Sequence, residues 1–167
     1  NAGCRPTKAL RASAAVAQLA RTGSLHGVKT DVEVDLATAV ARKDALISKW
    51  RDASAAYYED HPRISYVTAR ARIAGRSDNG FRITADGREV TAERVILNTG
   101  ARSVPPDLPG LNAVEWLDHH SILDLTDLPS RLIILGGSYI GLEFAQIFSR
   151  FGSRVTILQR GPRIIGG

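Results

Sequence analysis

Residues 131–143 read Arg-Leu-Ile-Ile-Leu-Gly-Gly-Ser-Tyr-Ile-Gly-Leu-Glu, and this stretch decides the fold. An apolar run of strand length ends in a glycine turn, and a helical pattern begins at once. Gly152 is expected to end that helix, and a second apolar strand pattern follows at residues 154–158. This order is typical of a βαβ unit in a doubly wound α/β domain, where dinucleotide phosphates lie on N–H groups at the helix N-terminus.

The glycine pattern departs from the ideal G-x-G-x-x-G at one position. Gly136 and Gly141 hold the first and third glycine places, but Ser138 holds the second. A serine carries a Cβ, which loosens the approach of a phosphate to the backbone. A βαβ unit without a ligand has a similar pattern, so that alternative stays open. The strand and helix that flank the turn are the context that favours a nucleotide site.

The composition indicates a globular protein and excludes several other classes. The chain of 167 residues is 44% hydrophobic and 23% charged. No apolar run approaches the roughly 20 residues of a membrane span, and no signal peptide is visible, so a cytoplasmic protein is expected. The net charge of +5 comes from scattered arginines without a basic run, so no nucleic-acid partner is expected. The lack of methionine and the end just past the second strand predict an internal piece of a longer chain.

The first helix is expected to begin next to the single cysteine. Pro6 suits a first helical turn, Ala14 belongs to a face of small residues, and Gly23 ends the pattern. Cys4 would then lie at a helix N-terminus beside Arg5, a setting that favours the thiolate. From the spacing alone, a structural or incidental cysteine fits equally well.

A long packing helix is expected from about Leu36 to Tyr58, capped by Asp35. Its charged residues indicate a solvated face: Arg42, Lys43, Asp44, Lys49, Arg51 and Asp52. The chain then predicts a small antiparallel β meander, with short strands at 64–67, 70–73, 81–84 and 89–91.

The next segments are expected to lead out of one domain and into another. The apolar run at 94–99 predicts a buried strand that returns to a parallel sheet. The prolines of 104–110 exclude a helix interior and a central strand, which places a domain junction there. His119 and His120 have no Cys or Glu at ligand spacing, so surface or capping roles are favoured and no metal is expected.

Three blocks together resemble the flavin-dependent pyridine nucleotide–disulfide oxidoreductases. Residues 1–10 are similar to the second half of the family's C-x-x-x-x-C redox motif. Residues 99–110 are similar to the segment that leaves the FAD domain, and residues 136–143 to the NAD(P) fingerprint. The resemblance covers essentially the whole chain and is closest to mercuric-reductase-like members. It implies an α/β fold of three-layer FAD- and NAD(P)-binding Rossmann-type domains, both partial, with the small antiparallel meander.

The resemblance also implies a division into domains. Residues 1–104 would be a partial FAD-binding domain without its first βαβ unit. Residues 105–128 would be a connector, and residues 129–167 the first βαβ unit of an NAD(P)-binding domain. The first FAD fingerprint, a later FAD segment and a C-terminal dimerisation domain with a His-Glu pair would be missing.

Roles for individual residues follow from the resemblance. Cys4 would be the redox cysteine nearest the flavin, with its partner upstream of Asn1, and Lys8 would approach the flavin and pair with Glu143 across the domain junction. Cys4, Lys8 and Glu143 are thus the candidate catalytic residues, and Tyr139 would gate the nicotinamide pocket. Candidate cofactor-binding residues are Lys8, Ala69, Thr99, Gly100, Ala101, Gly136, Gly137, Ser138, Tyr139, Ile140, Gly141, Glu143, Gln159 and Arg160.

The choice of pyridine nucleotide depends on the end of the second strand. Family members often carry a glutamate there that binds the 2′-hydroxyl of NAD. This chain has Gln159, followed by Arg160 and with Arg163 nearby. Because a neutral amide beside arginines accepts a 2′-phosphate better than an acid does, NADP is favoured.

The implied activity passes electrons from NAD(P)H through FAD to a redox cysteine pair, and on to a disulfide or a metal ion such as mercuric ion. The expected partners are a small-molecule or metal-ion substrate and a second copy of the chain in a homodimer. A dihydrolipoamide dehydrogenase and a non-catalytic nucleotide-binding fragment are the alternatives. The non-catalytic fragment remains an alternative because the partner cysteine is missing from this sequence.

Overall fold

The structure is a computed structural model that describes residues 3–165. The chain forms two compact units, which are described separately: Asn1–Ala53 with Pro105–Gly167, and Ser54–Val104. The outermost ends of the two expected domains, at residues 1–2 and 166–167, lie outside the described residues. The division into FAD domain, connector and NAD(P) unit stays a prediction.

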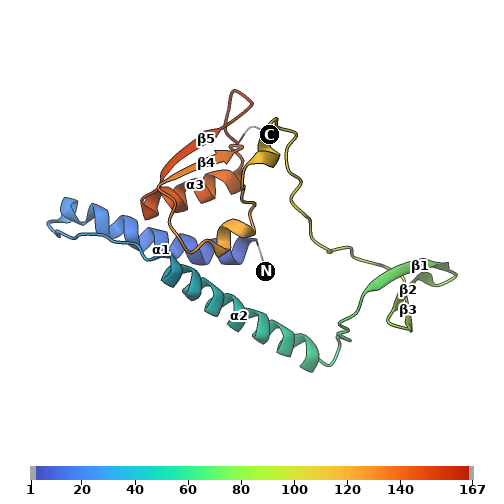
Figure 1. Ribbon diagram of the computed structural model, residues 1–167. Helices are drawn as coiled ribbons and strands as arrows, with labels where there is room; N and C mark the ends of the chain where they lie inside the picture. The colour runs from blue at the N-terminus through green and yellow to red at the C-terminus, as the bar shows by residue number, and fades with distance from the viewer. Residues whose placement is uncertain (1–2, 166–167) are drawn as a thin grey trace. The chain divides into compact units, whose positions relative to one another are not determined.

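The first unit contains the expected βαβ arrangement. β4 (Arg131–Leu135) and β5 (Arg154–Leu158) pair in parallel, and α3 (Tyr139–Phe151) connects them. α3 packs against this sheet, and α1 (Cys4–Thr22) packs against α3 (Figure 1). The order sheet, α3, α1 is the layering that an α/β fold requires, so the fold class predicted from the glycine turn is confirmed for this unit.

The core of this unit lies where the helices meet. Leu10, Ile147 and Phe148 are completely buried, and Phe148 and Phe151 contact each other edge to face with ring centroids 6.3 Å apart. The same cluster includes residues from α1, α2 (Leu36–Asp60) and η3 (Ser121–Asp124). Segments from both ends of the chain therefore form one hydrophobic core.

The ends of α1 and α2 follow the predicted signals. Gly23 is the C-cap of α1, and the chain continues as the 3₁₀ turn η1 (Gly23–His26). Asp35 caps α2, because its Oδ1 accepts a hydrogen bond from Thr38 N–H at 3.0 Å and its Oδ2 accepts one from the Thr38 hydroxyl at 2.6 Å. These hydrogen bonds, that from the hydroxyl above all, lower the pKa of the Asp35 carboxyl.

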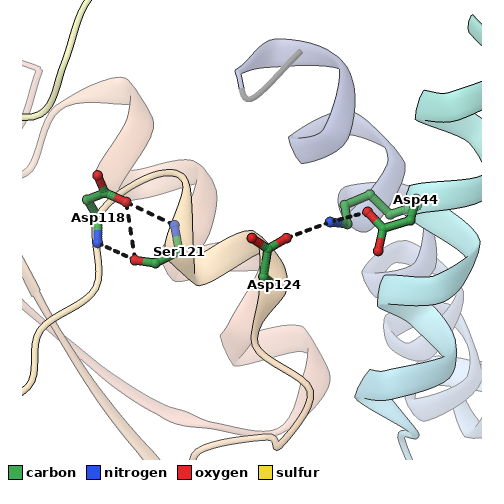
Figure 2. A network of polar contacts seen from close by, with 5 residues as sticks. Asp44, Asp118, Ser121 and Asp124 are labelled. Carbon is green, nitrogen blue, oxygen red and sulfur yellow. Dashed lines mark hydrogen bonds and ion pairs between the residues drawn. The ribbon is translucent and has the colours of Figure 1, made fainter. Parts of the chain in front are cut away.

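Lys43 corrects the expectation of a fully solvated charged face on α2. Its side chain is 3% exposed, and Nζ lies 2.7 Å from Asp44 Oδ1 and 3.3 Å from Asp124 Oδ1 (Figure 2). Asp118, three residues before η3, is in the same view, and its Oδ1 accepts a hydrogen bond from Ser121 N–H at 2.9 Å. The ammonium thus joins α2 to η3 because its aliphatic stem is covered while its charge reaches exposed carboxylates.

The second unit contains the expected antiparallel meander. Its strands pair in the order β1-β2-β3, and they are β1 (Ala71–Ser77), β2 (Gly80–Ala85) and β3 (Arg88–Ala92). Asp86 and Gly87 both have positive φ, 46° and 80°, which is the backbone of a type I′ hairpin turn. The strand expected at 64–67 is wrong, since that segment belongs to none of the three strands.

The buried strand expected at 94–99 is also wrong. Residues 94–100 have no secondary structure, and Ile96 and Leu97 are 90% and 72% exposed. An apolar run becomes a strand only where a neighbouring strand takes up its backbone N–H and C=O groups. Within the described residues the parallel sheet consists of β4 and β5 alone, and this segment pairs with neither.

Candidate functional site: a glycine turn beside an ion pair

The glycine turn between β4 and α3 has the geometry of a phosphate-binding turn. Gly136 has φ +104°, which disfavours any residue with a Cβ, and nothing lies within 4 Å of a Cβ built on it. A Cβ built on Gly141 would collide with the carbonyl oxygen of Gly136. The first glycine therefore leaves open space before the turn, and the third allows α3 to pack close to β4.

The first turn of α3 is left without a side-chain cap. Ser138 is the N-cap residue in an extended conformation, and its side chain makes no capping hydrogen bond. The N–H groups of a first helical turn have no partner within the helix, and the helix dipole favours an anion there. Tyr139 and Ile140, at the start of α3, are 73% and 39% exposed. The open turn, the uncapped helix and the small residues fit a dinucleotide pyrophosphate.

Gln159 lies against this turn. Its Oε1 accepts a hydrogen bond from Gly137 N–H at 2.7 Å, and its Nε2 donates to the carbonyl oxygen of Arg163 at 3.3 Å. The N–H of Ile165 donates to Gly137 O at 2.9 Å. The structure therefore brings Gly137 and Gln159 together and leaves Arg160 exposed next to them.

The second feature of the site is the ion pair expected between α1 and α3. Lys8 Nζ lies 2.5 Å from Glu143 Oε1, with the two side chains 52% and 22% exposed. Glu143 is in the second turn of α3, close to the glycine turn. Cys4 is an exposed free thiol one helical turn before Lys8, so both side chains belong to the same face of α1. The Cys4 thiol, the Lys8 ammonium and the Glu143 carboxylate therefore all lie toward the N-terminal end of the α1–α3 pair.

Arg21 is a functional candidate that sequence reasoning missed. Its guanidinium donates to the carbonyl oxygens of Arg150 and of Phe151, the latter at 2.9 Å from Nη2. Both acceptors are in the last turn of α3, whereas Arg21 is in the last turn of α1. The sequence does contain two hints of this contact: Gly152 marks the C-terminal end of one helix, and Arg21 lies near the C-terminal end of another. Only packing decides that these two ends meet.

Four other candidate residues lie in the second unit. Ala69 is half-buried, and Thr99, Gly100 and Ala101 are exposed, with Gly100 at φ +79°. Their expected contacts with FAD stay predictions.

The paired histidines are next to a turn. His120 N–H donates to Asp118 Oδ1 at 2.9 Å, and the two imidazole rings lie 4.1 Å apart. Between residues 3 and 165 no three His, Cys, Asp or Glu side chains are grouped so that they could hold a metal ion.

A family model described as pyridine nucleotide-disulphide oxidoreductase matches residues 1–167. The chain belongs to this family. Among known members, it is 32% identical to mercuric reductase of Bacillus cereus over 166 residues. The alignment covers 99% of this chain and 26% of that protein. It is 32% identical over 171 residues to dihydrolipoyl dehydrogenase of Cupriavidus necator, covering 99% of this chain and 35% of that protein.

A solved structure of the family agrees with the fold. The HOCl-induced flavoprotein disulfide reductase RclA from Escherichia coli superposes with a TM-score of 0.75 at 32% identity, over 99% of this chain and 34% of that chain. The chain spans between about a quarter and a third of the length of these relatives. No described helix has the length and apolar character needed to cross a membrane.

Proposed function

We propose that this family member acts, within its complete protein, as an FAD-dependent NAD(P)H oxidoreductase that delivers electrons to a disulfide or a metal ion. The single observation that supports this best is the 2.5 Å Lys8–Glu143 pair, which joins the thiol-bearing helix to the helix that follows the glycine turn. When bound, the FAD supplies the two-electron relay between the nicotinamide and the cysteine pair.

Each residue of the site has a distinct part in this proposal. The turn at Gly136 and the N-terminus of α3 bind the pyrophosphate of the nucleotide. Lys8 provides a positive charge beside the flavin ring, and Glu143 holds its ammonium group in place. Tyr139, largely exposed at the start of α3, covers the nicotinamide pocket. Cys4 is the cysteine nearest the flavin, and together with a second cysteine of the complete protein it forms the redox pair that takes electrons from the flavin and passes them to the substrate.

NADPH is the nucleotide proposed for this protein. The Gln159 side chain is a neutral amide, so it places no negative charge against a 2′-phosphate, and its Oε1 and Nε2 are held by hydrogen bonds within the chain. Arg160 and Arg163 are exposed beside it and provide the positive charge. The KM values of the complete protein for NADPH and NADH test this preference. A lower value for NADH would contradict it.

Mercuric ion and a small disulfide are the two acceptor classes proposed, in line with the relatives named above, and the complete protein is proposed to be a homodimer. Turnover with mercuric ion, lipoamide and other disulfides separates the acceptors.

The decisive experiment replaces Cys4 by serine in the complete protein. We expect Cys4→Ser to leave the reduction of the flavin by NADPH intact, because the nucleotide site and Lys8–Glu143 are unchanged, and to abolish turnover of any acceptor. Stopped-flow absorbance of the flavin and steady-state oxidation of NADPH measure the two steps. Retained turnover would exclude the thiol role, and a protein that binds no flavin would favour a non-catalytic nucleotide-binding module.

A further inference from the structure

The C-terminal end of α3 is completed by a residue from another helix. An α-helix leaves its last four carbonyl groups without partners of its own. In α3 the carbonyl oxygen of Phe148 accepts from the N–H groups of Gly152 and Ser153, and that of Ser149 accepts from Gly152 N–H. The remaining two carbonyls, of Arg150 and Phe151, accept from Arg21. Half of the open acceptors of α3 are therefore bound by α1.

The same helix pair is joined at its other end by the Lys8–Glu143 contact. Lys8 and Arg21 are 13 positions apart on α1, which corresponds to about 20 Å of helix. The two cations meet α3 at its second turn and at its last turn, so α1 and α3 run in the same direction. Arg21 lies at the C-terminal end of α3, where the helix dipole favours a cation, and Lys8 lies beside a carboxylate near the start of α3.

The contact surface between these two joints is apolar. Ala14 and Ala17 of α1 are buried in the cluster that includes Ile147 and Phe148. Apolar contacts of this kind have no direction, whereas the two hydrogen bonds of a guanidinium fork have a fixed geometry. A shift of α1 by one helical turn is about 5.4 Å, which would break a 2.5 Å ion pair.

We infer that Arg21 is a positioning residue: by binding the last carbonyls of α3 it sets the register of α1 along α3, and so holds Lys8 against Glu143 and Cys4 at the end of the pair. The guanidinium lies directly against the end of α3, since a Cβ added at Gly152 would lie 3.4 Å from Arg21 Nη2. This inference builds on the proposed function, but the register of the helices can be measured without it.

The test compares Arg21→Ala, Arg21→Lys and the control Arg11→Ala in the complete protein. Arg11 is an exposed cation on the same helix. The first readout is amide hydrogen exchange. We expect Arg21→Ala to speed exchange at 150–153 and also in the first turns of α1 and α3, about 20 Å away. Faster exchange confined to 150–153 would show a local cap only and overturn the inference.

The second readout is the reduction of the flavin by NADPH. We expect Arg21→Ala to slow this step by about tenfold with an unchanged nucleotide Kd, because misplacing Lys8 affects geometry and not binding. Arg21→Lys should recover part of the rate, since it keeps the charge and one donor. A rate equal to that of Arg11→Ala would overturn the inference. If the wild-type flavin is not reduced at all, the proposed function fails, and hydrogen exchange still decides the role of Arg21.

Discussion

At the scale of single residues, the site depends on contacts that are individually weak. The Lys8–Glu143 pair has one side chain 52% exposed, and exposed ion pairs contribute only about 0–1 kcal/mol to stability. Its importance is therefore in placing a charge and not in holding the fold. The glycines of the turn are different, because their effect is steric and does not depend on solvent.

Glu143→Gln should separate placement from stability. We expect the variant to keep a midpoint of thermal unfolding close to that of the wild type, because the pair is partly solvated. We expect flavin reduction by NADPH to slow on the order of tenfold, because the Lys8 ammonium loses its charged partner. Rapid-mixing spectroscopy and calorimetry measure the two effects, with Glu115→Gln as an exposed control. Equal rates for the two variants would contradict the role assigned to the pair.

Gly141→Ala should be costly for a steric reason. A Cβ at this position would collide with Gly136 O and lie 3.2 Å from Ile134 Cγ2, so α3 must move away from β4. We expect a loss of about 1–3 kcal/mol in the free energy of unfolding, measured with urea. Gln146→Ala on the exposed side of α3 is the control and should cost nothing. Equal stability of both variants would mean that α3 does not pack as described.

At the scale of elements, helix ends determine how the helices are held. α2 begins at a side-chain cap from its own sequence, Asp35, whereas α3 ends on a cap from another helix, Arg21. The first kind of cap can be predicted from a local pattern. The second cannot, because Arg21 and Phe151 are 130 positions apart.

The cap at Asp35 should make α2 sensitive to acid. The folded-state pKa of this carboxyl is lowered by the hydrogen bonds from Thr38, so its contribution to stability is present above the unfolded pKa of about 3.9. That contribution is lost as the pH falls through the lower folded pKa. We expect the stability difference between wild type and Asp35→Asn to shrink below about pH 4. Urea unfolding at a series of pH values measures this difference.

Glu33→Gln is the matched control for this measurement, since Glu33 is an exposed acid near the same helix start. A difference for Asp35→Asn that stays constant down to pH 2 would contradict the charged cap.

At the scale of the whole molecule, the chain is between about a quarter and a third of the length of its relatives, and one of its segments lacks a neighbour to pack against. Ile96 and Leu97 are exposed on a stretch that has the composition of a buried strand. Because large aliphatic side chains are unfavourable in water and this segment has no strand partner, we expect it to be covered in the complete protein.

Limited proteolysis should reveal this difference. We expect the isolated chain 1–167 to be cut within 94–104, because an extended exposed segment enters a protease site readily. The complete protein should resist cleavage there, and mass spectrometry of the fragments locates the cuts. The hairpin turn at 86–87 is an internal reference, since it belongs to the same small sheet in both cases. Equal cleavage at 94–104 in both proteins would contradict the expected covering.

The sequence by itself determined the features that arise from neighbouring residues: the βαβ unit with its glycine turn, the start of α2 at Asp35, and the meander with its Asp86–Gly87 turn. Those patterns are local, because helix caps, turns and periodicity involve positions a few residues apart. Through resemblance, it also led to the pairing of Lys8 with Glu143.

The tertiary structure alone decided what Lys43, Arg21 and residues 94–100 do. Lysine is usually a surface residue, but the side chain of Lys43 is covered by packing. Arg21 binds the last carbonyls of a helix that begins more than a hundred positions later. Residues 94–100 have the pattern of a strand but no neighbour to pair with. In each case the outcome depends on what lies beside the residue in space. The hydrogen-bond partners and the side chains that cover these residues come from segments distant in the sequence.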